Sequence, residues 1–291
     1  MTAELSPTEI VRLMVGRPVD ALYPRSPRRR GAPILEVSDF GTSGATFTLH
    51  RGEILGIAGL LGAGRTRLIR GLFGLEPVRT GRVRLGTWSG HAAPDARWRM
   101  GCGMLSEDRK EEGLAAALSV ADNMTLSRLE GLGPGPLIFP RWQDRAAVRW
   151  MNRLHIKSRG PRQTVAELSG GNQQKVAIAR LLHHDVDVLL LDEPTRGIDV
   201  ASKAQIYELI DELVRERRAS GDAERGTSGT SERAADARPR AVLMISSYVP
   251  ELLGLCDRVA VMCRGRLGEP RPVADLTEHG LMLEATGAGD A

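Results

Sequence analysis

The stretch that decides the fold is IAGLLGAGRTRLIRGL, residues 57–72. It begins as an apolar run typical of a buried strand, turns through three closely spaced glycines and continues with helical spacing. The glycines follow the pattern G-x-x-x-x-G-K-[ST], in which a loop between strand and helix wraps a chain of phosphates. The stretch therefore predicts an α/β domain with a phosphate site. Its candidate contacts are Gly59, Leu60, Leu61, Gly62, Ala63, Gly64, Arg65, Thr66 and Arg67.

One position departs from this pattern, because Arg65 stands where the pattern requires lysine. A lysine ammonium is a compact point charge, whereas the planar guanidinium of arginine occupies a different volume. We expect phosphate binding to persist in a weakened form, with the terminal phosphate positioned worst. Thr66 keeps the hydroxyl that binds Mg²⁺ in loops of this kind. The alternative is a glycine turn that binds no ligand.

A second candidate is the acidic end of VDVLLLDE, residues 186–193. Its continuous apolar run predicts a strand that is buried on both faces. Asp192 at the tip can hold Mg²⁺, usually through water, and Glu193 can polarise an attacking water. Hydrophobic strands also end in acidic residues without any catalytic role. The interpretation therefore depends on the glycine loop and on the sequence PTRGID that follows, residues 194–199.

A third stretch, LSGGNQQKVAIAR, Leu168–Arg180, decides the class of protein. Ser169 offers a hydroxyl and Gly170 and Gly171 offer exposed N–H groups, and a helix is expected to begin directly after them. This arrangement is a second anion-binding helix terminus. One phosphate chain needs one glycine cradle, so a second cradle in the same domain indicates a site assembled between two domains.

Together, GLLGAGRT, LSGGNQQKVAIAR, LLLDEPTRGIDV and the closing LEATG resemble an ABC-type ATPase domain. More narrowly, they resemble the second, C-terminal ATPase half of the tandem ATP-binding subunits of bacterial monosaccharide importers of the ribose, xylose and galactose class. The resemblance covers nearly the whole chain. It implies a P-loop NTPase fold of the ABC type, with a mixed, largely parallel sheet, an antiparallel β subdomain and an inserted helical subdomain.

The resemblance also implies roles for individual residues. Residues 59–66 match the Walker A loop, Asp192 the Walker B aspartate that holds Mg²⁺ with Thr66, and Glu193 the catalytic glutamate. The signature that would contact a partner's ATP comprises Leu168, Ser169, Gly170, Gly171 and Gln173. Gly197, Ile198 and Asp199 match the D-loop, and Ser106–Lys110 falls where the Q-loop meets a membrane subunit, with Glu107 near the usual glutamine.

The departures from the family pattern concentrate at one pocket. Ser247 stands at about the position of the switch histidine, so no imidazole can contact the terminal phosphate there. Phe40 is a weak candidate for the aromatic residue that stacks on adenine. Arg65 could reflect drift, because the chain has lysine only at 110, 157, 175 and 203. Two losses at one site, and the GAGRT that second halves of this family also carry, favour a site that binds Mg·ATP but hydrolyses it slowly.

The chain divides into an N-terminal helix and basic linker at 1–31 and an ABC ATPase domain at 32–287. Within the domain we expect a helical subdomain at about 107–167 and a disordered insertion at about 219–240, where Ser, Gly, Ala and charged residues cannot build a core. RVAVMC, residues 258–263, is expected to be the last strand. Arg28–Arg30 are expected to be a solvated tether, with a membrane-surface contact as the alternative.

Composition excludes several other classes of protein. The net charge of +4 comes from 40 basic and 36 acidic residues, too balanced to indicate nucleic-acid binding. No apolar run approaches the roughly 20 residues that a membrane span needs, and the N-terminus carries no export signal. Three cysteines stand in no paired or metal-binding spacing and fit buried thiols in a reducing compartment.

We therefore expect an energy-coupling subunit of a sugar importer, an ATPase that is weak or inactive as an isolated chain and uses ATP and Mg²⁺. Its expected partners are a second ABC ATPase domain, an integral membrane sugar permease and, indirectly, a periplasmic or lipid-anchored sugar-binding protein. The expected location is cytoplasmic, peripheral on the inner face of the cell membrane. The alternatives are a soluble ABC ATPase that acts on ribosomes or DNA, a nucleotide-binding regulator and, least favoured, a P-loop kinase, in which LSGG would have no role.

Overall fold

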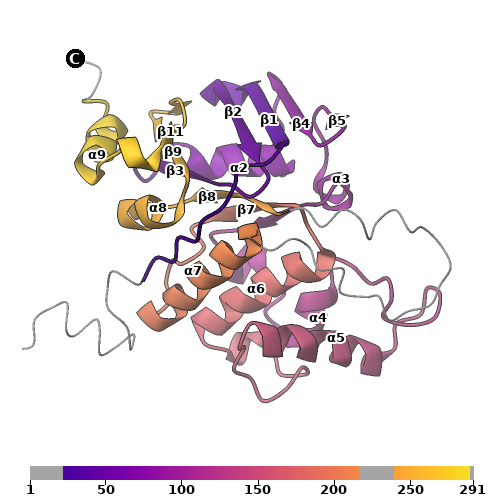
Figure 1. The fold of residues 1–291 in the computed structure, drawn as a ribbon. Coiled ribbons are helices and arrows are strands. Elements are labelled where there is room, and N and C mark those ends of the chain that lie inside the picture. Colours follow the sequence, from indigo (N-terminus) through magenta and orange to yellow (C-terminus); the bar gives the residue numbers. More distant parts are fainter. Residues whose placement is uncertain (1–21, 216–238, 289–291) are drawn as a thin grey trace, which may run out of the picture.

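The computed structural model describes residues 22–215 and 239–288 (Figure 1). The helix expected at the N-terminus lies outside the described residues, and so does the insertion expected at about 219–240, apart from its last two residues. No helix within 22–215 or 239–288 is long and apolar enough to cross a membrane.

The larger of two sheets has the strand order β10-β9-β3-β8-β7-β6, and β11 pairs with β9. Its strands are β3 (Ile54–Gly59), β6 (Cys102–Leu105), β7 (Val188–Asp192), β8 (Ala241–Ile245), β9 (Arg258–Cys263), β10 (Arg266–Leu267) and β11 (Arg271–Pro272). The first five are parallel, and the last two pair antiparallel with β9. RVAVMC is therefore not the last strand: two residue pairs fold back on β9, too short to show any periodicity in the sequence.

The smaller sheet is antiparallel, with the order β2-β1-β4-β5. Its strands are β1 (Pro33–Phe40), β2 (Ala45–His50), β4 (Arg82–Leu85) and β5 (Trp88–Ser89). The strands predicted from ILEVSDF and ATFTLH are confirmed, because their apolar side chains alternate and face one core. Helix α2 (Arg65–Phe73) lies in that core between the two sheets.

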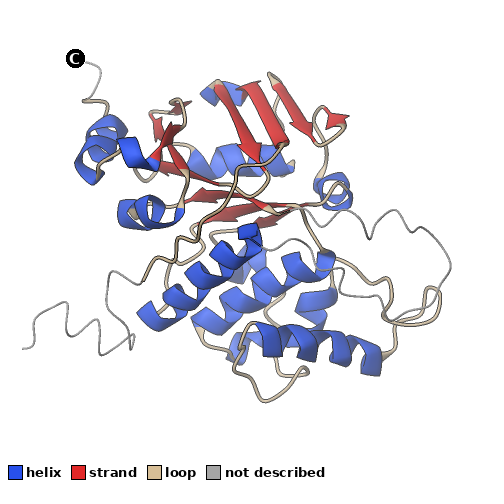
Figure 2. Ribbon diagram, in the orientation of Figure 1, coloured by secondary structure: helices blue, strands red, loops and turns tan. Residues whose placement is uncertain are grey.

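The remaining helices cover the other face of the large sheet and its ends (Figure 2). They are α3 (Pro94–Arg99), α4 (Val120–Thr125), α5 (Pro140–Arg153), α6 (Gly170–His184), α7 (Val200–Arg215), α8 (Val249–Leu255) and α9 (Glu278–Thr286). Strand β7 shows the two-sided burial, because Val188 and Leu190 pack toward α2 whereas Leu189 and Leu191 pack toward α6 and α7. This burial on both faces explains the unbroken apolar run of the sequence.

The region 107–167 contains one helical turn, η3 (Arg109–Gly113), followed by α4, α5 and the short turn η4 (Val165–Glu167). Helix α4 begins with a capping box, in which Ser119 Oγ accepts from the N–H of Asp122 at 3.1 Å. Both α4 and α5 pack on α6, whose first turn carries the LSGG stretch. These helices therefore fix the direction in which that turn points.

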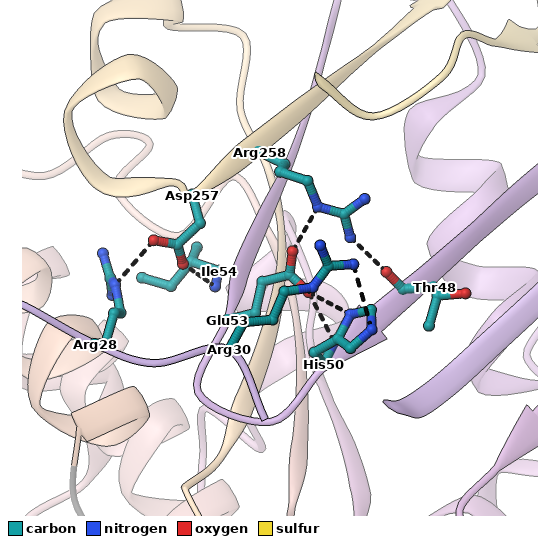
Figure 3. Close-up of polar contacts among 8 residues, drawn as sticks. All are labelled: Arg28, Arg30, Thr48, His50, Glu53, Ile54, Asp257 and Arg258. Carbon is teal, nitrogen blue, oxygen red and sulfur yellow. Dashed lines mark hydrogen bonds and ion pairs between the residues drawn. The ribbon is translucent and has the colours of Figure 1, made fainter. Parts of the chain in front are cut away.

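The basic linker is not a solvated tether at Arg28, which corrects the expectation from sequence. The Arg28 side chain is buried, with 5% exposed, and donates to Asp257 Oδ1 at 3.1 Å (Figure 3). It also donates to the carbonyl of Leu255 at 2.8 Å. Tyr23 stacks on the ring of Tyr207 and packs directly against Gly254. Only a folded domain brings these acceptors next to the linker, so the arginine run alone could not reveal them.

Glu53 forms the second half of this cluster (Figure 3). Its buried carboxylate accepts from Arg258 Nε at 2.6 Å and from the backbone N–H of His50 at 2.8 Å. Arg30 approaches it to 3.8 Å from an exposed position, and Arg29 is also exposed. The linker is thus tied to the domain at the edge where β3 and β9 begin.

Candidate functional site

The glycine loop joins the end of β3 to the start of α2, as the sequence predicts. Gly64 has φ 104° and is the N-cap of α2, and no side chain caps this helix. Gly59 has φ 153°, and a Cβ there would lie 2.5 Å from the carbonyl oxygen of Met262. The loop therefore keeps the N–H groups at the start of α2 open to an anionic ligand.

Arg65 is the most unusual feature of this loop. Its guanidinium is buried, with 6% of the side chain exposed, and Nη1 lies 3.4 Å from Glu193 Oε1. Burial lowers the pKa of Arg65, and the negative charges of Glu193 and Asp192 oppose this shift. Arg65 Nη1 has no hydrogen-bond acceptor among the described residues. The arginine is thus paired with the carboxylate next to the phosphate site.

Asp192 ends β7 with none of its surface exposed. Neither carboxylate oxygen makes a hydrogen bond of normal geometry within the described residues. Burial raises the pKa of Asp192 to about 6, while the nearby Thr66 hydroxyl and the charge of Arg65 act in the opposite direction. A buried carboxylate with two unsatisfied oxygens next to a threonine hydroxyl fits a Mg²⁺ ion, which prefers hard oxygen ligands.

Glu193 adopts a backbone conformation that is rare for a residue with a side chain, with φ 46°. Its N–H donates to the carbonyl of Ile245 at 2.9 Å, and its carboxylate, 9% exposed, faces Arg65. Such strain persists only where the surroundings hold it, and it concentrates at functional sites. Glu193 is therefore close to the phosphate loop, but its charge is already engaged by an internal cation.

A pocket of about 830 Å³ surrounds the loop and α2. Seven of the nine predicted loop contacts line it, from Leu61 to Arg67, and so does Glu107. The structure adds wall residues that the sequence had not indicated: Gly41, Thr42, Ser43, Glu76, Pro77, Val78, Arg79, Thr80, Arg264 and Gly265. These come from η2 (Gly41–Ser43), the loop after α2 and the turn after β9, none of which carries a local motif.

Phe40 also lines this pocket, but its ring is part of the core. The residue is 2% exposed, stacks on His91 at 5.8 Å between ring centroids and packs against Gly71. Little of the ring is left to stack on a base, which agrees with its weakness as a candidate.

Gly59, Leu60 and Ser247 lie on the other side of the loop, where they line a smaller cavity of about 190 Å³. Apolar side chains from α8 and α9 complete that cavity. Ser247 is exposed, one residue after the buried Ser246. The switch position therefore faces the loop from the end of β8, with a short hydroxyl in place of an imidazole.

The signature turn, Ser169–Gly171, begins α6 and does not line the pocket of its own chain. Ser169 is the exposed N-cap, and Asn172 Nδ2 donates to its Oγ at 2.9 Å. Gly171 is buried against Ser202, whose side chain leaves no space for a Cβ. Leu168 and Gln173 are both 8% exposed and face their own subdomain. The turn thus presents a helix terminus away from the first phosphate site.

The D-loop, Gly197–Asp199, packs beside the signature turn. Asp199 accepts from the N–H and the hydroxyl of Ser202 at 2.8 and 2.7 Å, which lowers the pKa of this aspartate and starts α7. Glu107 forms an ion pair with Arg196, just before the D-loop. The structure therefore joins three motifs that are distant in the sequence.

The other titratable side chains that the structure describes do not form a metal site. Within 22–215 and 239–288, no group of three His, Cys, Asp or Glu residues is arranged to hold a metal ion. Cys102 and Cys256 are buried as expected, whereas Cys263 is half-buried. A bound Mg²⁺ would therefore depend on Asp192, Thr66 and ligand oxygens.

Comparison with known proteins agrees with this geometry. Residues 42–196, more than half of the chain, match the family profile described as ABC transporter. The chain is 40% identical over 291 residues to ribose import ATP-binding protein RbsA 1 of Streptomyces avermitilis, covering 97% of this chain and 51% of that protein. It is 37% identical to a putative ribose/galactose/methyl galactoside import ATP-binding protein of Rhizobium etli, covering 98% and 51%. The chain spans about half the length of the curated relatives it matches.

Solved structures show the same fold. The ATP-binding cassette MJ1267 of an ABC transporter superposes with a TM-score of 0.68 at 17% identity, covering 88% of this chain and 98% of that one. A dimeric post-hydrolysis state of the cassette MJ0796, bound to ADP and Pi, gives 0.64 at 16% identity, covering 82% and 99%. These likenesses confirm the predicted fold class.

Proposed function

Because the chain belongs to the ABC transporter family, we propose that it is the nucleotide-binding, energy-coupling half of a bacterial sugar importer. Its likeness to ribose and galactoside import ATP-binding proteins supports the sugar class. It acts at the inner face of the cell membrane on an integral membrane permease, which receives sugar from a binding protein. Its position as the second, C-terminal half rests on the resemblance of GLLGAGRT, LSGGNQQKVAIAR, LLLDEPTRGIDV and the closing LEATG to that half.

The observation that carries this proposal is the separation of two open helix termini. The start of α2 lines the chain's own pocket, whereas the start of α6 lies outside it with Ser169 exposed. The N-terminus of a helix favours a negatively charged ligand. The signature turn does not line the pocket of its own chain, so a phosphate bound in that pocket cannot be its ligand. A second ATPase domain placed head to tail would bring its ATP to this turn. Ser169–Gly171 would then complete the partner's site.

The chain's own pocket is proposed to bind Mg·ATP and to turn it over slowly. The loop amides and Arg67 would hold the phosphates, and Thr66 and Asp192 would hold Mg²⁺, which neutralises phosphate charge when bound. Glu193 is the catalytic glutamate by position, but its pairing with Arg65 withdraws it from an attacking water. Ser247 offers no imidazole to the terminal phosphate. Both features lower the transition-state stabilisation on which phosphoryl transfer depends.

Two measurements on the purified chain test this function. A fluorescent ATP analogue should bind in the presence of Mg²⁺, and ATP turnover should stay well below the ~10 s⁻¹ of a typical enzyme. Turnover near that value would show that the pocket is fully competent. Copurification with an integral membrane permease from cell membranes separates a transport subunit from a soluble ATPase or regulator, and recovery only from the soluble fraction would contradict the transport role.

A further inference from the structure

The segment Ser106–Gly113, here called the bridge segment, connects the helix of the phosphate loop to the turn after Glu193. At one end, Arg70 Nη1 donates to both carboxylate oxygens of Glu112, at 2.8 and 2.7 Å. The Ser106 hydroxyl donates to the same carboxylate at 2.8 Å. Arg70 lies about one turn beyond Thr66 on α2. This end of the bridge segment is therefore fixed to the helix that supports the phosphate loop.

The middle of the bridge segment reaches the D-loop and the signature helix together through Arg109. Its Nη1 donates to the carbonyl of Arg196 at 2.9 Å, and its Nη2 donates to the carbonyl of Gly197 at 3.2 Å. Nη1 also lies 3.5 Å from Gln174 Oε1 in α6. Glu107 adds its ion pair with Arg196. The bridge segment thus contacts the turn after Glu193 at two backbone carbonyls, those of Arg196 and Gly197, and at the side chain of Arg196.

The signature turn is packed directly against the same guanidinium. A Cβ at Gly170 would lie 2.8 Å from Arg109 Nη2 and 3.2 Å from the carbonyl oxygen of Gly197. Groups at such close separations transmit a displacement instead of absorbing it, because protein interiors are densely packed. A shift of Arg109 therefore moves the signature turn and the D-loop together.

Glu107 supplies the link from the bridge segment to the ligand, because it lines the pocket of the phosphate loop. A bound triphosphate would repel this carboxylate and change its ion pair with Arg196. We infer that Arg109 is a positioning residue, through which occupancy of the pocket sets the placement of the D-loop and the signature turn. The inference rests on the proposed function, since it takes Mg·ATP as the ligand of the pocket.

The geometry explains why arginine is needed at this position. The planar fork holds two separate nitrogens in fixed positions against two consecutive carbonyl oxygens, whereas lysine would have to reach both with one nitrogen at the end of a flexible stem. Arg99 on α3 offers a matched control, because it is 72% exposed and its ion pair joins it only to Asp95 within its own helix.

The experiment uses the full chain as wild type, Arg109→Gln, Arg109→Lys and the control Arg99→Gln. Hydrogen exchange is followed in peptides covering residues 168–173 and 196–202, with and without Mg²⁺ and a non-hydrolysable ATP analogue. In wild type and control, nucleotide should slow exchange in both peptides by about tenfold. Arg109→Gln should bind the nucleotide with unchanged affinity but lose this protection in both peptides. Arg109→Lys should keep only part of it, and Glu112→Gln should show the same loss because it frees the other end.

The outcomes separate the inference from the function on which it rests. Full protection in nucleotide-bound Arg109→Gln would overturn the role of Arg109 and leave the proposed function intact. A variant that loses nucleotide affinity and melts at a lower temperature would show that Arg109 merely holds the fold, which also overturns the inference. A wild-type chain that binds no nucleotide would overturn the proposed function and the inference together.

Discussion

Two aspartates at opposite ends of the strands of the same parallel sheet, Asp192 buried and Asp257 half-buried, have contrasting surroundings. Asp257, just before β9, accepts from the N–H of Ile54 at 2.8 Å and from Arg28 Nε at 3.1 Å (Figure 3). Asp192, at the end of β7, makes no hydrogen bond of normal geometry within the described residues. Burial raises the pKa of both carboxyl groups. The fold therefore satisfies one carboxylate with the linker and the start of β3, and leaves the oxygens of the other without a hydrogen bond.

The two buried arginines next to these aspartates repeat the contrast. Arg28 donates from Nε and Nη2 to acceptors at hydrogen-bond distance, and only its Nη1 is limited to an ion pair, at 3.4 Å from Asp211. Arg65 has its Nη1 buried without a hydrogen bond and only a 3.4 Å ion pair with Glu193. Satisfied buried charges hold a fold together, whereas unsatisfied ones are retained where a ligand will complete them. The comparison places the candidate phosphate site at the carboxyl ends of the parallel strands, whereas the charges at their amino ends stabilise the fold.

The largest effect on this comparison is expected from Asp257→Ala. The change leaves the N–H of Ile54 without its acceptor and Arg28 with only Leu255 and Asp211 as partners, and breaking a largely buried pair typically costs about 3 kcal/mol of stability. Urea denaturation followed by circular dichroism measures the loss. The control Asp95→Ala removes an exposed pair and should change stability little. An unchanged urea midpoint for Asp257→Ala would mean that the stability of the fold does not depend on the pairing of Asp257 with Arg28.

Asp192→Asn, at the carboxyl end of β7, should have the opposite effect on stability. Removing a buried charge whose oxygens make no hydrogen bond of normal geometry should raise the stability of the ligand-free chain by about 1 kcal/mol, because the cost of burying the charge outweighs its stabilisation by the nearby Thr66 hydroxyl and Arg65. The same change should weaken Mg²⁺-dependent nucleotide binding by at least about tenfold, or 1.4 kcal/mol. Denaturation and fluorescence titration with and without Mg²⁺ measure the two effects. If the variant binds Mg·ATP like wild type, Asp192 is not the metal ligand.

Arg65→Lys should sharpen the comparison by restoring the residue that the loop pattern requires. A compact ammonium can move from Glu193 to the phosphates, so we expect nucleotide affinity to rise several-fold and ATP turnover to increase. Arg99→Lys serves as a matched control, because Arg99 is exposed on α3 and lies outside the pocket lining. Equal affinity in wild type and Arg65→Lys would contradict the geometric argument for a weakened site.

The smallest expected effect is on pH dependence. The pKa of Asp192 is raised to about 6 in the folded chain, so the folded state binds more protons than the unfolded state between about pH 4 and pH 6. The contribution of Asp192 to stability is therefore complete below about pH 4 and is lost as the pH rises through 6. Consequently the stability advantage of Asp192→Asn over wild type should shrink on going from pH 7 to pH 4. A constant advantage across this range would show that the carboxyl is not perturbed.

Local patterns predicted much of the fold. The strand, glycine loop and helix at 57–72 occur as expected, because backbone freedom at glycine and apolar periodicity act within a few residues. The buried strand that ends at Asp192 and the helix that begins after Ser169 also occur as expected. The two short strands after β9 were missed because two residues carry no period.

The roles of single charges could not be predicted in the same way. Arg28 looked like part of a solvated run, and its burial depends on Asp257 and Leu255, which lie far along the chain. The contacts of Arg109 with the D-loop and with α6 likewise exist only after the sheet and the helical region have packed. Neither spacing nor composition carries information about such partners.

The sequence by itself determined that this chain is an ABC-type cassette with a phosphate loop carrying Arg65, because those blocks specify strand, turn and helix locally. The tertiary structure decided where the charges find their partners: Arg65 pairs with Glu193, Arg28 pairs with Asp257, and both oxygens of Asp192 lack a hydrogen bond of normal geometry within the described residues. The physical reason is that a buried charge is stabilised only by groups within a few ångströms, and packing alone brings distant residues that close.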